Sequence, residues 1–328
     1  MNDDELTARL RAARPHTPRR GQTIDARQET LLKQIVAEPA PVGIVSGRTR
    51  RGPGWHTRPI WLVAASVMLV IVLGALGSIA LFQPSAAVAA TPKLLTPEPV
   101  DGTSKENLMR ISDDVRGTGP AGDRRIRFQT WALAFDPEAA TPPRFIAPEE
   151  HEIVHLPDGS VSVTVRAGMP YGADGELVPD ASPAPGTVLW SDVQAAGDAT
   201  PLFGPPPTEE SQITEFFKKS GTVSSGTSGE YFSAIRLLLS EKALSSEQEA
   251  ALIGFLATLP DIKVDGTVTD RLGRDGVAFS TDSRSPGEYR DTLVLSASVG
   301  ILSYEVAYIG SSRTDIQAPA VIEYIAWQ

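Results

Sequence analysis

An uninterrupted apolar stretch constrains this chain more than any other feature of its sequence. Residues 60–82 read IWLVAASVMLVIVLGALGSIALF and contain no charged side chain. At about 1.5 Å per residue, a helix of this length spans roughly 34 Å, which is enough to cross the apolar core of a bilayer. A helix buried in a soluble core usually keeps a polar stripe, and this stretch has none. The sequence therefore predicts one transmembrane helix at residues 60–82.

The charge of the chain changes sign across this stretch. Eleven basic and six acidic residues precede it, whereas 19 basic and 34 acidic residues follow it. Four arginines lie just before the stretch without a nearby acid, which indicates the cytoplasmic side of a membrane span that can also contact anionic lipid. These topology anchors are Arg48, Arg50, Arg51 and Arg58. We expect a single-pass protein of the cell membrane with a cytoplasmic N-terminus and an acidic extracytoplasmic domain, which is not a nucleic-acid binder.

A cleaved export signal is the alternative to a retained anchor. Ala87 and Ala89 precede Ala90 with the small-residue spacing that signal peptidases prefer. The apolar stretch is longer than a usual signal core, however, and residues 1–59 precede it with helix signals of their own. Retention is therefore the favoured interpretation.

Residues 1–59 are predicted to form a cytoplasmic arm with short helices. Leu6 and Leu10 fall on one face of a first helix. Leu31 lies one turn from Ile35 in a second helix that begins near Thr23 or Asp25. Isolated helices this short are marginal in water, so the arm is partly disordered unless it folds on a partner. The two interpretations are compatible, because a disordered tail can become ordered on binding.

The remainder of the chain is predicted as a tether followed by one folded domain. Residues 83–100 are rich in proline and alanine and form the tether, and residues 101–328 form the extracytoplasmic domain. Helices are expected from Thr103, opened by a capping box with Glu106, and at about 209–219, 230–241 and 246–259, the last opened by Ser246 and Glu249. Alternating apolar residues predict strands at about 125–129, 150–156, 161–165, 264–269, 276–280, 292–296, 301–308 and 321–327. The fold class expected is thus α+β, one transmembrane helix followed by an antiparallel sheet packed with helices.

Two patterns in the domain suggest chemistry but are better explained by strands and turns. Residues His151 to His155 spell H-E-x-x-H, which binds zinc in peptidases only when the two histidines lie one helical turn apart. The β-branched residues Ile153 and Val154 and the following Pro157-Asp158-Gly159 turn favour a strand, where positions four apart lie about 13 Å from one another. Residues 270–276 are similarly better explained as a tight turn than as a cation-binding loop. The chain has no cysteine, which excludes disulfides, thiolate zinc sites, iron–sulfur clusters and cysteine nucleophiles. Because the remaining motifs are weak, we expect no enzyme, metal site or cofactor.

The chain resembles a family of actinobacterial single-pass membrane proteins that are encoded beside extracytoplasmic-function sigma factors and described as anti-sigma factors. The matching features include the D-E-L-x-x-x-L-R beginning at Asp4, the R-F-x-T-W strand at 127–131 and the hairpin at 156–159. Residues 256–277 are similar to the family signature L-P-G-V-x-V-x-G-x-V-x-D-x-x-G-R-x-G-V-A. Asp261-Ile262 replaces its G-V, and residues 298–300 depart from its usual D-x-x-T-G turn.

The resemblance implies a regulator whose cytoplasmic arm sequesters a sigma factor and whose outer domain senses the state of the envelope. The arm residues that would contact the sigma factor are Leu6, Leu10, Leu31, Leu32 and Ile35. Zinc-containing anti-sigma factors carry a His/Cys cluster in this part, which a chain without cysteine cannot form. The alternative is an anchored domain that binds lipid or protein outside the cell and has no role with sigma factors. A deep cavity between sheet and helices would favour lipid, and a filled core would favour protein.

Overall fold

The computed structural model describes residues 89–117, 124–133, 144–198, 200–313 and 315–328. These residues form a nine-stranded antiparallel sheet with the strand order β4-β3-β2-β1-β9-β8-β7-β6-β5. The strands are β1 (Arg125–Ala132), β2 (Glu149–His155), β3 (Val161–Ala167), β4 (Val188–Gln194), β5 (Lys263–Thr269), β6 (Asp275–Thr281), β7 (Tyr289–Ser296), β8 (Gly300–Tyr308) and β9 (Ala320–Trp327). The pairing of β1 with β9 joins two meanders that are distant in sequence.

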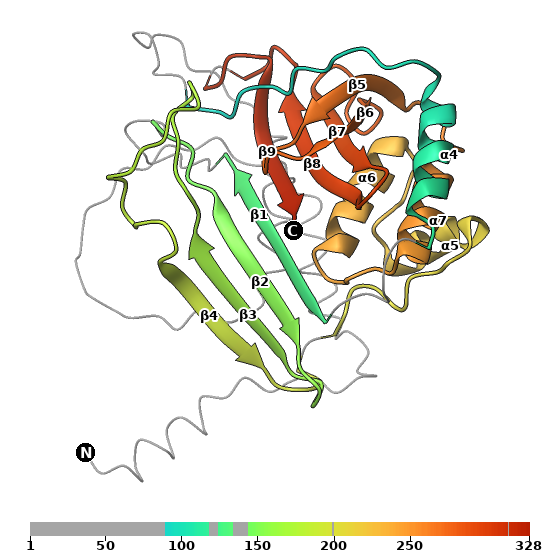
Figure 1. The fold of residues 1–328 in the computed structure, drawn as a ribbon, viewed down its shortest axis with the longest axis horizontal. Coiled ribbons are helices and arrows are strands. Elements are labelled where there is room, and N and C mark those ends of the chain that lie inside the picture. Colours follow the sequence, from blue (N-terminus) through green and yellow to red (C-terminus); the bar gives the residue numbers. More distant parts are fainter. Residues whose placement is uncertain (1–88, 118–123, 134–143, 199, 314) are drawn as a thin grey trace, which may run out of the picture. The chain divides into compact units, whose positions relative to one another are not determined.

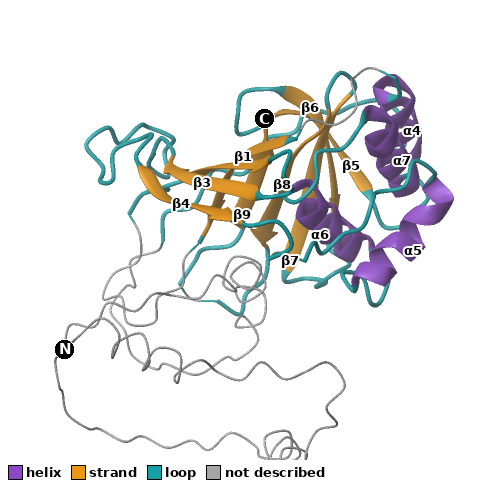
Figure 2. Ribbon diagram, turned by 90° about the horizontal axis from the view of Figure 1, so that it is seen from below, coloured by secondary structure: helices purple, strands orange, loops and turns teal. Residues whose placement is uncertain are grey.

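Four helices of the described ranges cover one part of this sheet. They are α4 (Ser104–Val115), α5 (Glu210–Ser220), α6 (Ser228–Leu239) and α7 (Ser246–Leu256). Figure 1 shows them gathered beside β5–β9, while β1–β4 extend away and leave β4 at a free edge. Figure 2, turned by 90°, shows the same separation between the helices and β3–β4. The sheet therefore has a helix-covered half and an extended half.

The main core fills the space between the helices and the sheet. Phe232 and Ile235 of α6 and Ile253 of α7 pack with Phe279, Leu293 and Tyr304 of the strands, and all six are almost completely buried. The alternation of apolar and polar residues in β1 sends Ile126 and Phe128 into the same cluster. These side chains occupy the space between the helices and the sheet.

The opposite face of the sheet is covered by chain segments without helices. Ala89 and Ala90 join a buried cluster with Tyr308 and Tyr324, and Leu95 packs against a third cluster formed by β5–β8. Further along, Glu98 forms two backbone hydrogen bonds with Thr267 of β5, of 2.8 and 2.7 Å. Residues 89–100, the described part of the predicted tether, thus lie against the sheet.

Most local elements agree with the sequence analysis. Thr103 and Glu106 form the expected capping box of α4, and the turn at 157–159 joins β2 to β3. Two details differ. Strand β4 lies inside 170–208, where no strand was predicted, and α7 is capped by Ser245 with Gln248 instead of by Ser246 with Glu249.

The predicted fold class is wrong, because it made a transmembrane helix part of the fold. Within the described ranges, no helix is both long and apolar enough to cross a membrane. The four helices have 11 or 12 residues, about half of what a bilayer requires, and the described part is mostly sheet. Residues 60–82, on which that expectation falls, lie outside the described residues.

Candidate functional site

The residues that the sequence analysis assigns to partner binding and topology lie outside the described part of the chain. All of them fall within residues 1–88. The residues expected to contact a sigma factor are Leu6, Leu10, Leu31, Leu32 and Ile35, and those expected to fix the orientation in the membrane are Arg48, Arg50, Arg51 and Arg58. Their roles stay predictions.

The H-E-x-x-H segment forms strand β2, as its β-branched residues predict. The His151 ring stacks on Phe128 with centroids 4.8 Å apart, and its Nε2 lies 3.0 Å from a carboxylate oxygen of Glu149. His155 instead reaches the backbone carbonyl oxygen of Glu241, at 3.3 Å. Among the described residues no group of three or more His, Cys, Asp or Glu is placed to hold a metal ion. The two histidines therefore serve packing and hydrogen bonding here.

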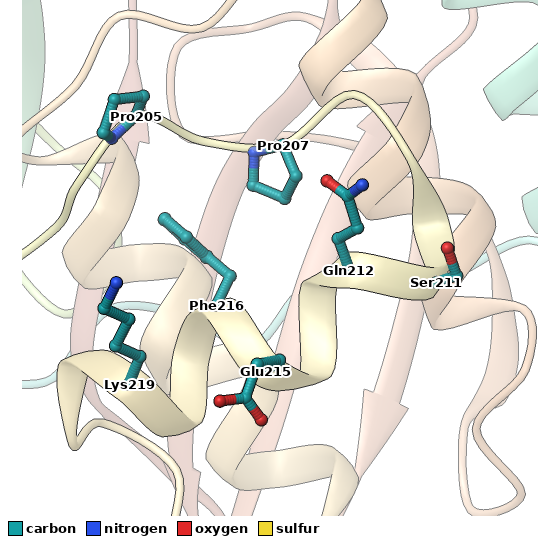
Figure 3. Close-up of a pocket in the computed structure, with 7 residues that line it drawn as sticks. All are labelled: Pro205, Pro207, Ser211, Gln212, Glu215, Phe216 and Lys219. Atoms are coloured by element: carbon teal, nitrogen blue, oxygen red, sulfur yellow. The ribbon is translucent and has the colours of Figure 1, made fainter.

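An open apolar groove lies beside α5. It has a volume of about 360 Å³ and is lined by Pro205, Pro207, Ser211, Gln212, Glu215, Phe216 and Lys219. Figure 3 shows the Phe216 side chain projecting from α5 toward the two prolines. Its floor is apolar, whereas Gln212, Glu215 and Lys219 supply polar groups around it. We call this feature the α5 groove.

Local sequence explains why Phe216 lines the groove. Ile213 and Phe217 lie four residues apart on one face of α5 and are fully buried, which fixes the rotation of the helix. Phe216, one position away, is left at the edge of the core, where it packs on Phe203 with ring centroids 5.8 Å apart. Gly221, with φ 75°, ends the helix in a left-handed conformation that favours glycine.

The wall of the groove opposite α5 is held by polar side chains from elsewhere in the fold. The Glu241 carboxylate accepts hydrogen bonds from the backbone N–H groups of Leu202, at 2.8 Å, and Phe203, at 3.2 Å. The Gln248 side-chain amide donates to the Pro206 carbonyl oxygen, at 2.9 Å. These contacts fix the proline-rich segment before a ligand binds. The segment therefore loses little conformational entropy on binding.

A second, smaller cleft contains Glu249. Its volume is about 130 Å³, and Arg127, Lys242 and Trp327 are among the residues that line it. Burial raises the pKa of the Glu249 carboxyl to about 8, although the backbone N–H of Ile301 donates to it and offsets part of that rise. The Trp327 indole N–H is buried and has no hydrogen-bond partner among the described residues. The cleft is smaller than most ligand sites, so we interpret Glu249 as a neutral structural group near pH 7.

Sequence analysis did not identify the α5 groove. The run Pro205-Pro206-Pro207, followed by Phe216-Phe217 on a predicted helix, was the available signal. Nothing local shows that the run folds back over the helix, because Glu241 and Gln248 hold it there from more than 30 residues away. The groove thus depends on tertiary contacts.

Comparisons with known proteins add little to these observations. No family model and no curated protein matches the chain. Among solved structures, a protein described as a MaoC domain dehydratase from Chloroflexus aurantiacus J-10-fl matches at 12% identity, over 69% of this chain and 81% of that one. The TM-score of 0.11 is too low to support an inference about fold or function.

Proposed function

We propose that this is a regulatory binding protein without enzyme activity, which acts as an anti-sigma factor. In this proposal the arm, through Leu6, Leu10, Leu31, Leu32 and Ile35, binds an extracytoplasmic-function sigma factor, and the domain described here receives the signal. The sequence resemblance at 4–11 and 256–277 supports the sigma-factor role. The change of charge sign before and after 60–82 supports a cell-membrane location with the N-terminus in the cytoplasm.

The observation that carries the regulatory role of the domain is its filled core beside an open apolar groove. A lipid carrier needs a cavity that encloses an acyl chain, whereas apolar side chains occupy the space between helices and sheet. The α5 groove is open, with an aromatic floor and a polar rim, which are features of surfaces that bind proteins. A protein segment is therefore the ligand that the geometry of the domain supports best.

Removing the apolar face of the arm should release the sigma factor. We expect the full-length chain to copurify with the sigma factor encoded beside it and to repress promoters of that sigma factor. Leu6→Asp combined with Leu31→Asp should raise promoter output at least about tenfold, because apolar anchors dominate most interfaces. Reporter assays in cells carrying either form measure this. Met109→Lys, an exposed substitution on α4, is the control and should leave repression intact. Full repression by the double variant would refute the sigma-factor role of these residues.

Filling the α5 groove should block signalling and leave repression in place. In Gln212→Trp an indole would occupy space beside Phe216, and the reporter response to sublethal detergent should fall from several-fold to near zero. The exposed position of Gln212 makes loss of folding an unexpected outcome. Promoter output with and without detergent separates the two effects. An unchanged detergent response would show that the groove does not receive the signal.

A further inference from the structure

The free edge of the sheet at β4 exposes apolar side chains. Among the described residues, strand β4 pairs only with β3, and Val188, Leu189, Trp190 and Val193 are 47, 40, 37 and 61% exposed. From Trp190 to Gln194 the pairing with β3 is regular, residue for residue. No backbone hydrogen bond from the described residues reaches β4 other than those of its pairing with β3. The outward N–H and C=O groups of this edge are thus available to another strand.

The other edge of the same sheet is protected. Glu98 lies against β5 and exchanges two backbone hydrogen bonds with Thr267. The neighbouring Gly266, at φ 140°, permits this approach, because a Cβ there would lie 2.1 Å from the Glu98 carbonyl oxygen. Natural edge strands are commonly protected by charged side chains, proline or bulges. Strand β4 contains no lysine or proline, its one charge is Asp192, and its bulge lies before Trp190. The two edges therefore differ in their ability to accept a strand.

The size of the β4 edge favours an extended segment of another protein over a second copy of this chain. Four half-exposed side chains on a seven-residue strand offer far less than the 1,200 Å² or so that stable interfaces between folded proteins bury. An added strand binds mainly through backbone hydrogen bonds, with alternate side chains giving specificity, and needs no larger surface.

The charge of β4 indicates the sequence that such a segment would carry. Asp192 is the one charged residue of the strand, and no ion pair with it is formed within the described ranges. It lies on the same face as Trp190, while Val193 points to the other face. We propose that β4 binds an extended partner segment as a tenth strand, with apolar residues at alternate positions and a lysine or arginine opposite Asp192. The site is separate from the α5 groove and does not depend on the sigma-factor proposal.

A designed peptide tests this directly on the full chain. The probe is a fluorescein-labelled peptide of sequence TVTVKVTVT, which places valines on one face and a central lysine on the other. Fluorescence anisotropy should show saturable binding, and Val193→Lys should weaken it at least about tenfold. Met109→Lys, which also replaces an exposed apolar residue, should have no effect. Amide hydrogen exchange should slow in β4 on binding while α4 stays unchanged.

A charge exchange distinguishes edge binding from nonspecific adhesion. Asp192→Lys should weaken the lysine peptide and strengthen TVTVEVTVT, so that the preference between the two peptides reverses. No saturable binding, or equal binding by the Val193→Lys variant, would overturn the proposal. So would a dimer detected by light scattering that Val193→Lys dissociates, because a second copy would then occupy the edge. The peptide assay and the promoter assays test separate proposals. A negative result in one does not change the interpretation of the other.

Discussion

Replacing Arg271 with methionine should lower the free energy of unfolding by about 3 to 5 kcal/mol, because it leaves a buried carboxylate without its cation. Arg271 donates from Nε and Nη2 to the two carboxylate oxygens of Glu305, at 2.6 and 2.9 Å, and from Nη2 to the carbonyl oxygen of Lys93, at 2.6 Å. The Glu305 side chain is 5% exposed. The substitution therefore removes every charge-assisted contact that Arg271 makes to this carboxylate.

The loss should depend on pH in a defined direction. Burial raises the pKa of Glu305 even with Arg271 beside it. Without the arginine, the folded state favours the protonated carboxyl still more, whereas the unfolded chain releases the proton above pH 4.5 or so. The unfolded state then binds fewer protons, and the stability of Arg271→Met should fall as pH rises from 5 to 8. Urea unfolding at several pH values measures this slope.

Two further variants identify the cause. Arg271→Met combined with Glu305→Leu removes both charges and should recover most of the stability, as apolar replacement of buried ion pairs generally does. Arg116→Met breaks the ion pair with Glu247, whose side chains are 42 and 48% exposed, and should cost less than about 1 kcal/mol. If the double variant is no more stable than Arg271→Met alone, the unpaired carboxylate is not the origin of the loss.

Sequence patterns predicted the elements of the domain because their signals are local. The capping box at Thr103, the alternation in β1 and β3 and the hairpin at 157–159 each involve residues within a few positions of one another. The turn that carries the signature residues is also local, since the Asp270 carboxylate accepts from the backbone N–H groups of Leu272 and Arg274 at 2.9 Å. The ion pair of Arg271, in the same turn, could not be predicted from a local pattern, because its partner Glu305 lies 34 positions away.

Strand β4 was missed for a different reason. It lies in a region crowded with proline and glycine, and Val188, Leu189 and Trp190 are consecutive apolar residues instead of alternating ones. A bulge in the pairing with β3 between Val165 and Arg166 accounts for this, because the regular alternation of faces is interrupted there. The proposed edge site uses the regular part of the strand, from Trp190 to Gln194, which follows this bulge.

Glu249 shows how a small shift in a helix start changes the role of a residue. The sequence predicted it as the capping partner of Ser246, which would place its carboxylate in solvent. In the structure Ser245 and Gln248 form the capping box instead. Glu249, one position further along, turns toward the β7–β8 connection, where a Cβ on Gly300 would lie 2.2 Å from its Oε2. Its carboxyl is thereby shielded from much of the water, although it still lines the smaller cleft.

Glu249→Gln should raise the free energy of unfolding by about 2 to 3 kcal/mol at pH 7 and change it little at pH 5. The folded-state pKa is about 8, against 4.5 in the unfolded chain. The folded state thus keeps a proton that the unfolded state releases, and this contribution to stability is complete below pH 4.5 and is lost as pH rises through 8. Glutamine cannot ionise, yet its side-chain oxygen can still accept from the Ile301 N–H, so the variant avoids that loss.

Unfolding of the wild type and the variant across pH 5 to 9 measures the difference. The difference in free energy of unfolding between the variant and the wild type should grow by roughly 1.4 kcal/mol for each pH unit above 5. It should level off above pH 8, where Glu249 of the folded wild type also ionises. Glu247→Gln is the matched control, because Glu247 lies on the same helical turn with its side chain 48% exposed. That variant should keep the pH dependence of the wild type. If the free energy of unfolding of Glu249→Gln and of the wild type changed with pH in the same way, folding would not change proton binding by Glu249. The raised pKa would then be refuted.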